Sequence, residues 1–100
     1  MHKIVYLPIA EDDILAAVEY IAYKLDNPSA AEALLDELDK TAERVAQSPY
    51  SSGLYRTDRP MRKEIRMVSV KNYVLYYAVA EETVEMQRLI HRRRDKTQLF

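Results

Sequence analysis

The stretch Tyr73-Val-Leu-Tyr-Tyr-Ala-Val79 predicts the central strand of a sheet, because an almost wholly apolar run of this length suits a strand that is covered on both faces. Before it, residues 65–70 alternate between two faces with the period of two that indicates a strand. Lys71-Asn72 is predicted as the tight turn between them, since asparagine tolerates positive φ. Residues 80–83 then turn the chain into a third run, Val84 to Ile90. Together these segments predict a three-stranded meander.

Two helices are predicted on the N-terminal side of the meander. The first spans Glu11 to Leu25 and repeats apolar residues at helical spacing, namely Ile14, Leu15, Val18, Ile21, Ala22 and Leu25. Asn27 can cap the second helix and Pro28 suits its first position, so this helix is predicted from Pro28 to Gln47. A link of about two residues implies that the helices form an antiparallel hairpin.

The remaining segments complete an α+β fold. Lys3 to Leu7 is a short β-prone run that Pro8 is expected to end, because proline lacks a ladder donor. Residues 48–53 end the helical half and continue as a loop through Asp58-Arg-Pro60 to about Met61. We therefore expect one domain over residues 1–100, in the order β-α-α-β-β-β: an N-terminal strand and an antiparallel helical hairpin packed on a small, mainly antiparallel sheet.

The composition excludes several classes of chemistry. The chain has no cysteine, so it offers no disulfide, thiol nucleophile or thiolate metal site. Its two histidines, His2 and His91, lie in distant segments, and one glycine cannot build a glycine-rich nucleotide loop. We therefore expect no metal and no cofactor. No apolar run approaches the ~18 residues of a membrane span, and no secretory segment follows Met1, so a cytoplasmic protein is expected.

The net charge of −1 hides a strong asymmetry between the two halves of the chain. Residues 1–53 carry four Lys/Arg and ten Asp/Glu, giving −6, whereas residues 54–100 carry eleven and six, giving +5. The densest cationic run lies in Arg88-Leu-Ile-His-Arg-Arg-Arg-Asp95. Adjacent guanidiniums repel one another, so this run indicates a place where the chain leaves the sheet, or where an anion or acidic partner binds.

Phosphate contact, an acidic protein partner and plain solubility all fit this pattern. We expect the basic residues at the start of the first meander strand to lie in the same region as the run. The candidate residues for contact with such a partner are Arg62, Lys63, Arg66, His91, Arg92, Arg93 and Arg94.

The order of these motifs resembles the RelE/ParE toxin superfamily of bacterial type II toxin–antitoxin pairs. The resemblance covers nearly the whole chain and rests on Asp26-Asn-Pro-Ser-Ala-Ala31, Ser48-Pro49, Arg66-Met-Val-Ser-Val-Lys-Asn-Tyr-Val-Leu-Tyr-Tyr77 and Arg88 to Asp95. It implies two helices packed on a small antiparallel sheet, which agrees with the fold expected from periodicity.

RelE-like members of the superfamily cut messenger RNA on the ribosome without a metal. Their pattern has alternating basic residues along the first meander strand and an arginine directly after the tyrosine that opens the next. This chain has Ile65 and Met67 in the first strand, and Val74 after Tyr73. The resemblance would leave a ribonuclease only Arg66, His91 and Arg93 as catalytic residues.

ParE-like members match better, because they show an NYV-type strand and an "LH-x-R-x-D" ending. Leu89-Ile90-His91-Arg92-Arg93-Arg94-Asp95 fits that ending with Ile90 inserted. The resemblance implies a toxin that traps DNA gyrase by binding, without catalysis, and that a cognate antitoxin neutralises in a hetero-oligomer. A RelE-like, ribosome-dependent mRNA endoribonuclease and an inactive member that only binds its partner remain the alternatives, so enzymatic activity stays open.

Overall fold

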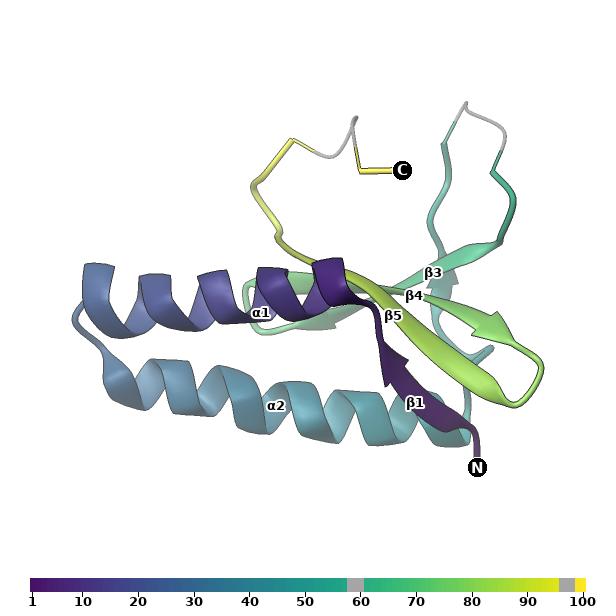
Figure 1. Cartoon of the computed structure of the whole chain (residues 1–100), viewed down its shortest axis with the longest axis horizontal. Helices are drawn as coiled ribbons and strands as arrows, with labels where there is room; N and C mark the ends of the chain where they lie inside the picture. The colour runs from purple at the N-terminus through teal and green to yellow at the C-terminus, as the bar shows by residue number, and fades with distance from the viewer. Residues whose placement is uncertain (58–60, 96–98) are drawn as a thin grey trace.

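A five-stranded sheet packs against two antiparallel helices in the computed structural model of the chain, which describes residues 1–57, 61–95 and 99–100 (Figure 1). The elements are β1 (Lys3–Tyr6), α1 (Pro8–Glu19), the π-helical segment η1 (Tyr20–Lys24), α2 (Pro28–Gln47), β2 (Gly53–Leu54), β3 (Ile65–Val70), β4 (Tyr73–Ala80) and β5 (Thr83–His91). The strand order is β1-β5-β4-β3-β2, with β1 parallel to β5 and the other pairs antiparallel. The predicted α+β fold is confirmed.

Both helices begin at a proline. The Asn27 side chain accepts a hydrogen bond from the Ala30 amide at 3.1 Å, and α2 has the predicted bounds. Pro8 was expected only to end the first strand, but it is also the first residue of α1. This position suits proline, because the first amides of a helix have no partner within it. The first helix therefore starts three residues earlier than predicted.

The first helix does not continue regularly to Leu25. After Glu19 the chain widens into η1, where the Leu25 amide donates to the Tyr20 carbonyl at 3.0 Å, five residues back. Leu15 and Leu25 were predicted on the buried face but are 59% and 55% exposed. The residues that face the core are Ala10, Ile14, Ala17 and Ile21, spaced by three or four, and Leu15 lies about 100° around the helix from Ile14.

Two-residue turns join the strands of the meander. Val70 pairs with Tyr73, which confirms the tight turn predicted at Lys71-Asn72, and Ala80 pairs with Thr83, so the second turn has the same length. Lys71, with φ of 55°, adopts the left-handed conformation that the sequence had suggested for Asn72. One positive φ at the first central residue suffices for a hairpin turn that follows the twist of the strands.

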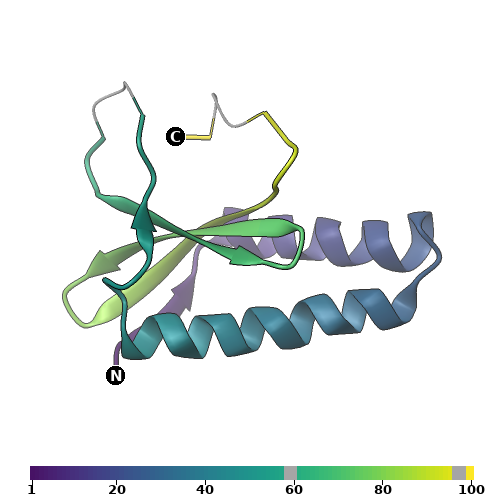
Figure 2. The ribbon, with the colours of Figure 1, turned by 180° about the vertical axis from the view of Figure 1, so that it is seen from behind.

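The sheet has an apolar core on each face, and β4 contributes to both. The helix-side core contains Leu75 and Tyr77 of β4, and the Tyr77 hydroxyl donates to the Pro49 carbonyl at 2.7 Å. The second core consists of Ile65, Val74, Tyr76, Ala78 and Ile90, covered by Tyr55, Met61, Leu99 and Phe100. Both the segment after β2 and the C-terminal tail extend from the sheet on the side away from α2 (Figure 2). The sequence did not indicate that the tail covers a core.

The segment between α2 and β3 was predicted as a loop, but it contains the short strand β2. Gly53 pairs with Met67 and Leu54 with Arg66, which extends the sheet by one strand. Residues 58–60 of the predicted loop lie outside the described residues. Within the described part of the chain, no helix combines the length and apolarity that crossing a membrane requires.

Candidate functional site

The basic run forms a structured end of β5, here called the basic end (His91, Arg92, Arg93 and Arg94). The Arg92 amide donates to the Asn72 carbonyl at 2.9 Å, and the Arg94 amide donates to the His91 carbonyl at 2.9 Å. All three arginines are exposed. Hydrogen-bonded backbone therefore presents three neighbouring positive charges to solvent, which raises the local potential for an anion.

His91 is held in place by one ring contact and one hydrogen bond. Its imidazole lies edge-on to the Tyr73 ring, with centroids 5.2 Å apart and an interplanar angle of 79°. Its Nδ1 accepts a hydrogen bond from the Arg93 amide at 3.2 Å. An accepting Nδ1 places the proton of the neutral ring on Nε2, so His91 offers an N–H donor from the other side of its ring.

A groove of about 400 Å³, here called the α1–β5 groove, lies between α1 and the end of the meander. It is lined by Asp13, Ala16, Ala17, Tyr20, Tyr73, Leu89, Ile90, His91 and Arg94. Burial raises the pKa of the Tyr73 phenol, and the nearby Tyr20 phenol raises it further. The groove thus brings two phenols, an imidazole and a guanidinium together from three elements.

An ion pair between Asp13 and Arg88 fixes α1 against β5 beside this groove. Arg88 Nε lies 2.7 Å from Asp13 Oδ2 and Arg88 Nη2 lies 3.1 Å from Oδ1, while the Leu89 amide donates to Oδ2 at 3.1 Å. The hydrogen bond to Asp13 and its negative charge raise the pKa of Arg88, whereas burial lowers it. β1 ends at Tyr6, which pairs with Met86, so no β1 residue lies beside Leu89. The Asp13 carboxylate accepts the hydrogen bond that the Leu89 amide would otherwise donate to a neighbouring strand.

The basic residues before β3 do not lie beside the basic end, contrary to the expectation from sequence. Ile65 pairs with Ala78 at one end of the meander, whereas Tyr73 pairs with His91 at the other. Five residues along a strand correspond to about 17 Å.

Arg62 and Lys63 instead line a second hollow of about 500 Å³ together with Leu7, Met61, Ile65, Glu85, Gln87 and Phe100. Lys63 Nζ also forms an ion pair with Glu85 at 2.6 Å.

Arg66 has a structural position. Its Nη1 donates to the carbonyls of Tyr50 and Ser52 at 3.2 and 2.7 Å, and its guanidinium lies 5.1 Å from the Tyr50 ring centroid. A further contact of 3.2 Å joins it to Glu64. With a side chain only 15% exposed, Arg66 fastens the segment before β2 to β3.

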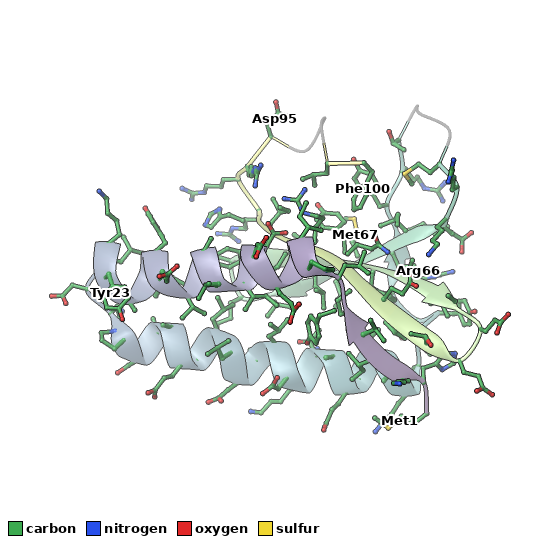
Figure 3. All side chains as sticks on the ribbon, in the orientation of Figure 1. Met1, Tyr23, Arg66, Met67, Asp95 and Phe100 are labelled. Atoms are coloured by element: carbon green, nitrogen blue, oxygen red, sulfur yellow. The ribbon has the colours of Figure 1, made fainter. Side chains whose placement is uncertain are left out.

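The three residues that a ribonuclease would need are not gathered in one place. Arg66 pairs with Tyr77, which lies four residues, or about 14 Å, along β4 from the Tyr73 that pairs with His91. Figure 3 shows the corresponding separation between Arg66 and Asp95, the residue that follows the basic end. His91 and Arg93 are adjacent, but the described contacts of Arg66 are with the segment before β3.

Sequence reasoning identified the basic end but missed the residues that face it. Tyr20, Tyr73 and Asp13 were not among the candidate residues. No local pattern links Asp13 to Arg88, which is 75 residues away. Neither residue stands out in its own segment, because Asp13 follows Glu11 and Asp12, and Arg88 follows Gln87.

Comparison with known proteins agrees with this architecture. Residues 4–96 match the family described as the ParE toxin of the type II toxin-antitoxin system, parDE. The fold is similar to a solved structure titled "Chromosomal ParDE TA system from P. aeruginosa", with a TM-score of 0.72 and 13% sequence identity over 91% of this chain and 96% of that one. No curated protein sequence gives a significant match. Since the family match spans almost the whole chain, this protein belongs to the ParE toxin family of type II toxin–antitoxin systems.

Proposed function

We propose that the chain inhibits bacterial growth by binding and trapping DNA gyrase in the cytoplasm, and that its basic end contributes to recognition of that target. The observation that supports this proposal is the contrast between an apolar face of the sheet and the basic end. Ile65, Met67 and Val74, where the RelE pattern has basic residues, lie on one sheet face, and Ile65 and Val74 belong to its apolar core. The arginines instead project from the end of β5. Exposed arginines at the basic end favour binding to a complementary surface over acid–base chemistry.

A cognate antitoxin is the second proposed partner. A segment of it would lay an apolar helix or strand against exposed apolar side chains and bring acidic residues to the basic end. Met67, which is 38% exposed on the second sheet face, and Val5, which is 37% exposed on β1, are available for such contacts. The toxin and antitoxin would then form a hetero-oligomer.

The role of the basic end is tested by Arg92→Glu combined with Arg93→Glu. We expect this variant to fold normally and to lose growth arrest, because a target with a complementary surface would meet negative charge. Lys40→Glu combined with Arg56→Glu applies the same change of charge at other exposed positions. Circular dichroism and thermal unfolding check the fold of both. Toxicity that persists in the first pair would remove the basic end from the mechanism.

The target is tested with purified protein in two separate assays. Inhibition of gyrase supercoiling without cleavage of messenger RNA on translating ribosomes is the expected result. Cleavage in the ribosome assay would overturn the proposal in favour of an endoribonuclease that uses His91 and the arginines. Inactivity in both assays, with antitoxin binding retained, would identify a member that only binds its partner.

A further inference from the structure

We propose that the α1–β5 groove is a nucleotide-binding site that accepts one base and its phosphate from a single-stranded nucleic acid. This goes beyond the proposed function, since trapping of gyrase by protein contact does not require it. The observations that carry it are the rings lining the groove, the donors that converge there and the space between them.

The rings provide surfaces on which a base can stack. Tyr20 is 52% exposed at the start of η1, and Tyr73 and His91 form the opposite wall with their ring contact. Stacking on aromatic side chains is the usual way in which proteins hold the bases of single strands. The helix side of the groove is lined by Ala16 and Ala17, whose small side chains leave room beside Tyr20.

The polar groups of the groove are mainly hydrogen-bond donors. Arg94 contributes a guanidinium, His91 its Nε2–H, and Tyr20 and Tyr73 their hydroxyls. A tyrosine phenol is already protonated at neutral pH at its ordinary pKa of about 10, and burial raises the pKa of Tyr73 further. The one carboxylate in the lining, Asp13, already accepts three hydrogen bonds from Arg88 and Leu89, so its charge is offset. A phosphate supplies the acceptors and the negative charge that these donors lack.

The dimensions and chemistry favour a nucleotide over an acidic peptide. A volume of about 400 Å³ falls within the range of small-ligand sites. An acidic side chain would satisfy the arginines of the basic end but would leave the ring faces unused. A duplex would satisfy the arginines as well, but its bases are stacked on each other and are not available to the tyrosines. A single strand uses both features.

The test is fluorescence anisotropy with a fluorescein-labelled oligothymidylate of about ten nucleotides. Tyr20→Ala should weaken binding roughly tenfold through the loss of one stacked base. Tyr23→Ala is the matched control, because Tyr23 lies in the same π-helical segment, is 81% exposed and does not line the groove. Its affinity should equal that of the unmodified protein.

The phosphate contact is tested by the salt dependence of the same binding. Arg94→Gln should reduce the slope of log K against log salt concentration by about 0.7, the value for one phosphate of a single strand. Arg56→Gln removes an exposed arginine outside the groove and should leave the slope unchanged. Equal effects of the two substitutions would show that only general electrostatic attraction operates.

Competition separates the possible ligands. If thymidine monophosphate displaces the probe at millimolar concentration, a free nucleotide is sufficient for binding. If only unlabelled oligothymidylate displaces the probe, the site binds single strands. If oligoglutamate displaces the probe as effectively as oligothymidylate does, the proposal is overturned in favour of an acidic peptide. Absence of binding at low salt, or equal losses for Tyr20→Ala and Tyr23→Ala, would also overturn it. None of these results depends on the supercoiling assay, so the two proposals can fail independently.

Discussion

Replacement of Asp13 by asparagine should lower the stability of the whole domain, although Asp13 lies on a helix that faces solvent on one side. Its carboxylate accepts two hydrogen bonds from Arg88 and one from the Leu89 amide. Asparagine can keep one oxygen in this position, but its amide group then faces an Arg88 donor and the negative charge is gone. Arg88 is thus left with a poorer partner in a side-chain environment that is only 14% exposed.

The expected magnitude follows from the number of bonds and the burial. A hydrogen bond to a charged group contributes about 1.5–3 kcal/mol, and loss of one partner from a fully buried ion pair costs about 3–5 kcal/mol. Asp13 and Arg88 retain 12% and 14% exposure, and the substitution removes only part of the contact. We therefore expect a loss of about 2 kcal/mol, which corresponds to a decrease in Tm of about 8–16 °C for a domain of this size.

Urea unfolding followed by circular dichroism measures this loss, and a double-mutant cycle assigns it to the pair. Asp13→Asn, Arg88→Met and the double variant should show a coupling energy of about 1–2 kcal/mol. Asp12→Asn is the matched control, because the exposed neighbouring carboxylate undergoes the same change in charge. If the losses of stability caused by Asp13→Asn and Asp12→Asn differed by less than ~0.5 kcal/mol, Asp13 would behave as an exposed carboxylate and its ion pair with Arg88 would not stabilise the domain.

Three further substitutions test other contacts by the same unfolding measurement. Tyr77→Phe should cost about 1–2 kcal/mol, because it leaves the buried Pro49 carbonyl without its donor, whereas Tyr50→Phe at a 63% exposed ring should have no effect. Tyr76→Phe should be neutral or stabilising by up to about 1 kcal/mol, since its buried hydroxyl has no hydrogen-bond partner among the described residues; a clear loss would contradict this. Asn27→Ala should cost about 1 kcal/mol through loss of the cap of α2, and an unchanged midpoint would show that the cap is dispensable.

The features that local chemistry determines were predictable from the sequence. Asn27 and Pro28 define the start of α2 by themselves, and the apolar run of β4 could only be accommodated between two covered faces. The turns at Lys71 and Glu81 lie where one strand-like run ends and the next begins two residues later. In each case the signal and the structure lie within a few residues of each other.

The features that were missed depend on contacts between distant segments. The cover that Leu99 and Phe100 provide for Tyr76 cannot be inferred from two apolar residues at a chain end. The arginine run predicted the basic end, but the tyrosines of the α1–β5 groove resemble ordinary core residues until α1 is placed beside β5. The sequence predicted Arg66 as a binding residue, and its hydrogen bonds to two backbone carbonyls were not predicted.

The parallel pairing of β1 with β5 has a consequence for the order in which the protein forms. Lys3 lies opposite Thr83, so β1 has no partner strand until β5, about 80 residues later, has been synthesised. Contacts between segments so far apart in sequence are slow to form, because a long loop must close before they contribute. An incomplete nascent chain therefore lacks the finished sheet, and the folded protein arises only after synthesis of the last strand. A ribosome that stops before β5 therefore leaves β1 with an unpaired edge.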